Sequence, residues 1–122
     1  MSTITTSTFD VAALRDAYAN RDAERLIALY APTATVEIVD AQNQPSKPRR
    51  LSGRDEIATH VRDVFSRDMT HEIGTSAVGD DALGFHLRCT YAEGGARVLC
   101  SSTAELQDGL IVSEVVVQAW DS

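Results

Sequence analysis

Glu114 is the most unusual residue in the sequence, because it interrupts an apolar run that extends from Leu110 to Val117. Alternation along a β-strand places Glu114 on the same face as Val112 and Val116. A buried carboxylate is costly unless it is paired or protonated, so proteins keep such a group mainly where it acts. If this face is open to solvent or to a partner chain, Glu114 is an ordinary surface charge.

Two histidines could act as a general acid or base beside this carboxylate. His60 falls within the apolar stripe of a predicted helix, and His71 begins a predicted strand. Each imidazole could act in this way if it reaches an internal pocket. The alternatives are that His60 lies at the edge of the stripe, satisfied by solvent or a backbone carbonyl, and that His71 lies at the surface.

Six further side chains are candidates for ligand binding in such a pocket. Trp120 could stack on a flat ligand or pack as a simple lid, and Gln118 and Tyr18 could orient a carbonyl or hydroxyl group. The full set is Tyr18, Phe85, Cys89, Ser102, Gln118 and Trp120.

The elements that must position these residues follow from periodicity. Helical spacing predicts two short helices before Pro32, the first capped by Asp10 and the second by Asp22, and a third helix over residues 53–66. The second helix is expected to carry Tyr30. Alternation predicts strands over residues 34–39, 69–78, 83–91, 98–106 and 110–120, with a polar loop over 40–52. Residues 1–8 are a predicted loose tail, and 9–122 form one predicted α+β domain.

Composition excludes several classes of function. The 122 residues carry a net charge of −7, and the basic residues are scattered, so we expect no nucleic-acid partner. Apolar runs are too short to cross a membrane, and the N-terminus lacks the features of a signal peptide, so we expect a cytoplasmic protein. Cys89 and Cys100 lack metal-ligand spacing and should be buried, reduced and slow to react.

Three motifs, in order and in register, resemble the nuclear transport factor 2-like superfamily, and especially its SnoaL-like and ketosteroid-isomerase-like branches. They are LIALYAP followed by ATVE from Leu26, LSGRDEI from Leu51, and DGLIV from Asp108. The resemblance covers residues 9–120. It implies a cone-shaped fold in which a curved antiparallel sheet wraps around three helices and encloses a pocket. It also implies a homodimer paired through the outer face of the sheet. The last strand is apolar on both faces, which supports such a dimer, and we expect His86, Arg88 and Val115 near the contact.

The resemblance also allows the residues needed for steroid isomerisation to be compared with those in this sequence. Steroid isomerisation needs a carboxylate base, a tyrosine and a protonated acid. The matching positions here hold Ile38, Leu14 and Ser102 (Thr103 if the register slips by one). We therefore expect no isomerisation of a Δ5-3-ketosteroid above the uncatalysed rate.

The resemblance and the polar candidates together predict a pocket for a small apolar, cyclic molecule. If the protein is an enzyme, it performs cofactor-free acid–base chemistry: isomerisation, dehydration, cyclisation or hydrolysis. The catalytic candidates are Glu114, His60 and His71, with His60 and Glu114 expected as a pair about 4–6 Å apart that titrates near neutral pH. The alternative is a binding or dimerisation module of the same fold without turnover.

Overall fold

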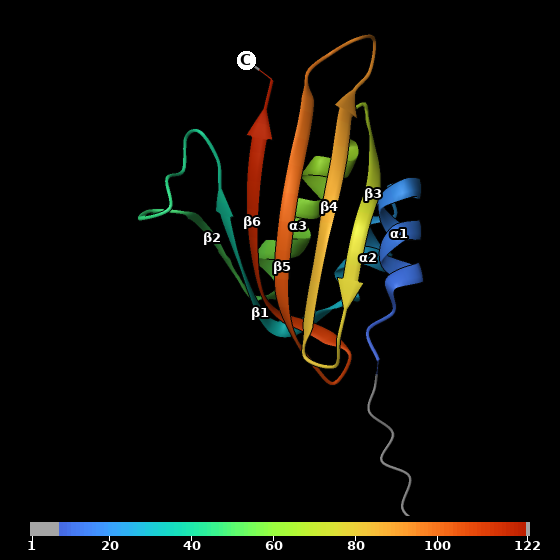
Figure 1. The fold of residues 1–122 in the computed structure, drawn as a ribbon, viewed down its shortest axis with the longest axis vertical. Helices are drawn as coiled ribbons and strands as arrows, with labels where there is room; N and C mark the ends of the chain where they lie inside the picture. The colour runs from blue at the N-terminus through green and yellow to red at the C-terminus, as the bar shows by residue number, and fades with distance from the viewer. Residues whose placement is uncertain (1–7, 122) are drawn as a thin grey trace, which may run out of the picture.

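Three helices and six strands make up the fold in the computed structural model, which describes residues 8–121 (Figure 1). The helices are α1 (Val11–Asn20), α2 (Ala23–Ile27) and α3 (Gly53–Ser66). Except for Thr8, the predicted tail over residues 1–8 lies outside the described residues. The predicted order of helices and strands is confirmed, with one short strand added.

The six strands form a single curved, open sheet. Its spatial order is β2-β1-β6-β5-β4-β3. The strands from β3 to β6 form an antiparallel meander, whereas β1 runs parallel to β6. The bounds are β1 (Tyr30–Val39), β2 (Arg49–Ser52), β3 (Met69–Val78), β4 (Ala82–Tyr91), β5 (Arg97–Gln107) and β6 (Leu110–Trp120).

Two local expectations are corrected by the structure. Helix α2 ends at Ile27, and Tyr30 begins strand β1 instead of continuing the helix. The main-chain groups there have tertiary partners, because Ile111 donates its N–H to the Leu29 carbonyl and the Arg54 guanidinium donates to the Tyr30 carbonyl. The predicted loop over residues 40–52 also ends in β2, which pairs with β1. Pairing with the rest of the sheet therefore overrides local spacing at both places.

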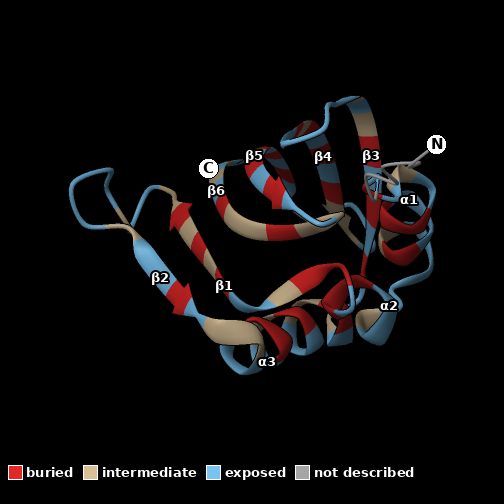
Figure 2. Ribbon diagram, turned by 90° about the horizontal axis from the view of Figure 1, so that it is seen from below, coloured by how far each residue is buried: buried red, intermediate tan, exposed pale blue. Residues whose placement is uncertain are grey.

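The helices cover the concave face of the sheet. Figure 2 shows α2 and α3 on the far side of the cone from β4 and β5, with α1 beside β3. Asp10 and Asp22 cap α1 and α2 as predicted, accepting the N–H groups of Ala13 and Arg25. Caps of this kind fix where each helix begins and thus which face it turns inward.

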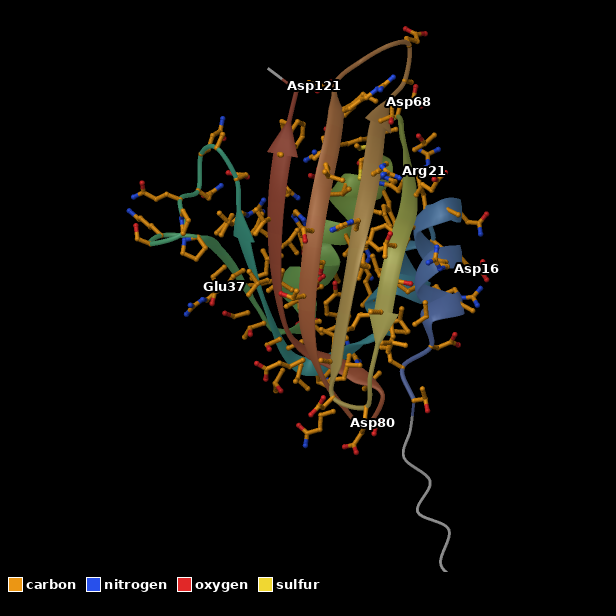
Figure 3. All side chains as sticks on the ribbon, in the orientation of Figure 1. Asp16, Arg21, Glu37, Asp68, Asp80 and Asp121 are labelled. Carbon is orange, nitrogen blue, oxygen red and sulfur yellow. The ribbon has the colours of Figure 1, made fainter. Side chains whose placement is uncertain are left out.

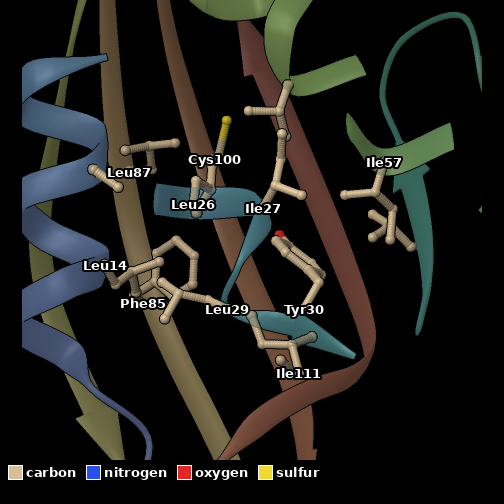
Figure 4. Close-up of a cluster of buried hydrophobic side chains, with 14 of the residues drawn as sticks. Leu14, Leu26, Ile27, Leu29, Tyr30, Ile57, Phe85, Leu87, Cys100 and Ile111 are labelled. Carbon is tan, nitrogen blue, oxygen red and sulfur yellow. The ribbon is translucent and has the colours of Figure 1, made fainter. Parts of the chain in front are cut away.

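Buried apolar side chains of the sheet and the helices form one core. Buried and exposed residues alternate strictly along β5, as expected for a strand with one face on the core and one face outward. Figure 4 shows side chains from α1, α2, β1 and β4 gathered there, including Leu14, Leu26, Phe85, Leu87 and Tyr30. The core therefore spans the sheet and the helices together.

Charged side chains lie at the periphery. Among those labelled in Figure 3, Asp16, Glu37, Asp80 and Asp121 project away from the sheet and helices. None of the helices in the described part of the chain combines the length and apolar character that a membrane crossing needs.

Candidate functional site

A cavity of about 220 Å³ lies between the concave face of the sheet and the helices. Its walls are mainly apolar, with residues such as Ile57 and Val61 from α3 and Val36 and Ile38 from β1. All nine residues proposed from the sequence line this cavity: Tyr18, His60, His71, Phe85, Cys89, Ser102, Glu114, Gln118 and Trp120.

Glu114 is buried deep in this cavity, with only 4% of its surface exposed. It lies in β6 opposite Ala104 of β5 and beside Val36 of β1, where small and aliphatic neighbours leave room for its side chain. Its carboxyl group makes two hydrogen bonds. Oε1 accepts from the Tyr30 hydroxyl at 2.5 Å, and Oε2 accepts from the Ser102 hydroxyl.

No cationic side chain among the described residues is paired with Glu114. Burial raises the pKa of the Glu114 carboxyl, while the hydrogen bonds from Ser102 and Tyr30 lower it by a smaller amount. Burial, with the nearby Glu114 charge, also raises the pKa of the Tyr30 and Tyr18 phenols. The cavity therefore contains a buried carboxyl group, Glu114, whose pKa is raised and whose two oxygens accept hydrogen bonds from neutral hydroxyl groups.

Tyr30 is the site residue that sequence reasoning missed. It was expected in a helix, packed between helix and sheet, because it continues the apolar spacing of Leu26 and Ile27. The one local signal against a helix there is Pro32, which disfavours helical geometry at the residue before it. That signal shows where the helix must end but not that the tyrosine faces the carboxylate.

A second polar group in the cavity is formed by His71 and two cysteines. His71 of β3 lies directly opposite Cys89 of β4, and its Nδ1 is 3.1 Å from the Cys89 Sγ. Cys100 lies on the neighbouring strand β5, facing the same cavity. The other ring nitrogen of His71, Nε2, is buried without a hydrogen-bond partner among the described residues. The surface alternative for His71 is therefore wrong, since the side chain is only 5% exposed.

His60 does not form the expected pair with Glu114. Both oxygens of Glu114 are engaged by Tyr30 and Ser102, and Glu114 is not among the charges that shift the pKa of His60. Burial first, and then the charges of Arg49 and Arg67, lower the pKa of His60 to about 4. The lowered pKa argues against the expected titration near neutral pH, because burial and the two arginines outweigh the nearby Asp63 carboxylate.

Aromatic and amide side chains form a more exposed part of the cavity wall. Trp120 packs beside Tyr91, with ring centroids 6.0 Å apart, and its indole N–H lies 3.4 Å from the Gln118 amide oxygen. Trp120 is 42% exposed. A ligand that enters the cavity would therefore meet an aromatic edge first and the carboxyl group last.

Comparison with known proteins agrees with this geometry. The sequence profile of the SnoaL-like domain matches residues 11–114, most of the chain. The chain belongs to the SnoaL-like family. No curated protein matches it in sequence.

Solved structures similar to this SnoaL-like domain share its fold at low sequence identity. A nuclear transport factor 2-like protein of unknown function from Mesorhizobium loti superposes with a TM-score of 0.75 at 18% identity, covering 89% of this chain and 87% of that one. A proposed ketosteroid isomerase from Kribbella flavida gives 0.72 at 17% identity, with 92% and 75% covered. IdmH, a proposed polyketide cyclase from Streptomyces antibioticus, gives 0.65 at 20%, with 88% of each chain covered. At these identities the likeness establishes the fold alone.

Aliphatic side chains occupy two positions that the sequence analysis matched to catalytic residues of the isomerases. Leu14 is buried in the core, and Ile38 lines the cavity. An aliphatic side chain neither accepts nor donates a proton, which is the reason for predicting no steroid isomerase activity. That absence remains a prediction. Within residues 8–121, no group of three or more His, Cys, Asp or Glu side chains is placed to hold a metal ion.

Proposed function

We propose that this SnoaL-like protein binds a small, mainly apolar, cyclic molecule in its cavity and moves protons on it with Glu114. The observation that carries the proposal is the Glu114 carboxyl group, which is buried in the wall of a mainly apolar cavity and has no paired cation among the described residues. Such a group is expensive to keep in a fold, and active sites are where proteins place carboxyl groups with raised pKa values.

The hydrogen bonds of Glu114 suit a group that exchanges protons. Tyr30 and Ser102 each engage one carboxyl oxygen, and each oxygen retains a second lone pair for a ligand. The two hydroxyl groups fix the orientation of the carboxyl group, so no side-chain rotation is needed when a proton moves. Glu114 would act as an acid in its protonated form and as a base in its ionised form.

The cavity favours a small ligand. Its volume of about 220 Å³ is below the roughly 300–1,000 Å³ of pockets that take drug-sized molecules. Isomerisation, dehydration, ring closure and hydrolysis all fit, because each needs only protons to be moved and no bound cofactor. The fold shared with IdmH, a proposed polyketide cyclase, supports ring-forming chemistry as one candidate.

A generic proton-transfer probe tests the role of Glu114 without knowledge of the natural substrate. The probe is 5-nitrobenzisoxazole, a small apolar bicyclic compound that opens to a coloured phenolate when a base removes its carbon-bound proton. We expect the wild-type protein to accelerate this opening. We also expect Glu114→Gln to lower the rate by about 100-fold or more, the usual effect of losing a general base. Glu105→Gln, which alters an exposed carboxylate on the outer face, is the matched control and should keep the wild-type rate.

The same experiment separates catalysis from simple binding. Probe binding can be followed by the fluorescence of Trp120, the only tryptophan in the sequence. Binding without base-dependent turnover would favour a binding module over an enzyme. A Glu114→Gln variant with full activity would remove Glu114 from the chemistry.

A further inference from the structure

The cluster of His71, Cys89 and Cys100 is left unused by the acid–base proposal, although it lines the same cavity. The antiparallel register of β3 and β4 places His71 directly across from Cys89. The imidazole Nδ1 and the Cys89 sulfur are 3.1 Å apart, within hydrogen-bond range. A thiol next to an imidazole is the arrangement that activates cysteine nucleophiles.

We propose that Cys89 is a nucleophile that captures electrophilic ligands, namely α,β-unsaturated carbonyl compounds, by conjugate addition within the cavity, with His71 as its base. This activity uses different side chains from Glu114 and does not require the acid–base function. It replaces, for Cys89, the sequence-based expectation of an inert core thiol. The sequence alone does not show that His71 lies beside the Cys89 sulfur.

The surroundings of Cys89 favour its thiolate. The titratable side chains that face it are His71 from β3, Cys100 from β5 and Tyr18 from α1. A hydrogen bond from Cys100 and the interaction with His71 outweigh burial and lower the pKa of Cys89 to about 5. The pKa of Cys100 is raised by its hydrogen bond with Cys89 and by burial, so Cys100 remains the protonated partner that donates.

The reaction step balances with these groups alone. The Cys89 proton passes to His71 Nδ1, and the sulfur forms a bond to the β-carbon of the ligand. The carbon–carbon π bond breaks, and its electron pair moves through the conjugated system to the carbonyl oxygen as an enolate. The imidazolium then gives the proton on Nε2 to the enolate, so that a neutral thioether and a neutral imidazole remain. No oxidant, metal or other co-reactant is consumed.

The free nitrogen of His71 independently indicates a ligand at this place. His71 lines the cavity, and its Nε2 is buried and has no hydrogen-bond partner among the described residues. An unmet buried polar atom carries a free-energy cost that a bound partner would remove. A carbonyl oxygen of the ligand, where negative charge develops during the addition, is the acceptor that this N–H group fits.

The apolar walls set which electrophiles can react. Phe65 and Tyr18 pack close to the His71 ring, with centroids 5.2 and 6.1 Å away. A compact uncharged enone can replace water there, whereas a charged reagent would have to shed its hydration. Exposure to bulk solvent is slight, because Cys89 is only 5% exposed.

N-ethylmaleimide is a suitable probe because it is a small, uncharged α,β-unsaturated carbonyl compound. The chain has only two cysteines, so intact mass spectrometry counts the adducts directly. We expect one adduct on the native wild-type protein and one on Cys100→Ser, but none on Cys89→Ser at the same exposure. Labelling of Cys100 in preference to Cys89, or no labelling of the native protein, would overturn the proposal.

The pH dependence of labelling tests the role of His71. For the wild-type protein the rate should reach half its maximum below pH 7, well under the ordinary thiol value of about 8.5. His71→Gln should move that midpoint upward by one pH unit or more and slow labelling at pH 6 by at least tenfold. Circular dichroism checks that the variant is folded. The pH profile of the wild-type protein tests the proposal even if the variant does not fold. A labelling midpoint at pH 8 or higher would contradict an activated Cys89 thiol.

Discussion

His60 and Glu114 show how the same physical effect drives an acid and a base toward their neutral forms. Burial lowers the pKa of the imidazole to about 4 and raises the pKa of the carboxyl group. Neither group has an opposite charge close enough to reverse the effect of burial. Near neutral pH the cavity therefore holds a neutral imidazole at one place and a carboxyl group that is reluctant to ionise at another.

The lowered pKa of His60 predicts that acid will destabilise the protein. Between pH 6.5 and about 4 the unfolded chain binds a proton at His60 that the folded chain refuses, so stability falls as the pH falls through this window. The loss is no more than about 3 kcal/mol, from 1.36 kcal/mol per pKa unit. Urea denaturation of wild type and His60→Gln at pH 7 and pH 4.5 measures it.

The variant should lose less stability on acidification than the wild type does. His86→Gln, which changes an exposed histidine on the outer face, is the matched control for general acid effects. Equal pH slopes for wild type and His60→Gln would contradict the burial argument.

The hydroxyl groups that hold Glu114 can be removed one at a time. Tyr30→Phe and Ser102→Ala each take away a single buried hydrogen bond while leaving most of the packing intact. We expect each to cost about 1–3 kcal/mol of unfolding free energy, since the carboxyl oxygen left behind is buried. Each should also raise the pKa of Glu114 further, because both bonds lower it. The two measurements are chemical denaturation and the pH profile of the proton-transfer assay. An unchanged profile in both variants would contradict the assigned contacts.

Strand β3 is tied to helix α1 by a single arginine side chain. It forms the outer edge of the sheet, and its pairing with β4 is irregular between Ile73 and Ser76. Arg15 of α1 spans this irregularity, because its guanidinium donates to the carbonyls of Ile73 and Gly74 and to the Ser76 hydroxyl. A helix thus substitutes for the missing neighbour strand at the edge that carries His71.

Arg15→Ala should loosen this edge. We expect a loss of about 1–2 kcal/mol, because the bonds are charge-assisted but partly open to solvent. Hydrogen exchange of the β3 amides should accelerate more than that of β5 amides. Arg25→Ala, which removes an exposed ion pair with Asp16, is a matched control and should change exchange little. Uniform protection in both variants would show that Arg15 does not hold the edge.

Local patterns predicted most elements but not how they meet. Alternation correctly placed Phe85, Cys89 and Glu114 on inward faces, and capping residues located α1 and α2. The strand β2 was missed because Arg49 and Arg50 follow a proline-broken polar stretch and show no alternating pattern. Its pairing with β1 supplies the order that its own residues lack.

The site depends on register, which no local pattern contains. Tyr30 meets Glu114 because β1 lies beside β6, and His71 meets Cys89 because β3 and β4 pair at that step. Sequence reasoning proposed side chains that line the cavity, but it paired Glu114 with His60 rather than with Tyr30. The family resemblance predicted the cone-shaped fold. The hydrogen-bond partners of Glu114 and His71 follow only from the strand pairing in the structure.

The outer face of the sheet presents apolar side chains to solvent. Leu99, Val115 and Val117 are 48%, 43% and 50% exposed, on neighbouring strands β5 and β6. We expect this face to pair two copies of the chain, since apolar clusters of this kind are typical of interaction sites.

Val117→Glu should give a monomer in light scattering at micromolar concentration, whereas the wild type should give a dimer. Thr103→Glu at the opposite register position of Val115 should act similarly, and Glu72→Gln on the edge strand should not. A wild-type particle of 13.2 kDa would contradict the prediction.

The parallel pairing of β1 with β6 has a consequence for the time course of folding. Tyr30 and Glu114, which meet across this pair, are separated by 84 residues in the chain. Closing so long a loop costs entropy before any contact compensates for it, and folds rich in distant contacts form slowly. The meander from β3 to β6 joins neighbouring segments and can assemble first, so that β1 closes on β6 at the end.

The cavity is then completed by the final step of folding and opened by the first step of unfolding. Contacts made after the rate-limiting step govern the unfolding rate. Tyr30→Phe should accordingly hasten unfolding in stopped-flow experiments and leave the refolding rate nearly unchanged. A molecule bound in the cavity against both β1 and β6 would resist the same opening, so occupancy would lengthen the lifetime of the folded chain without speeding its formation.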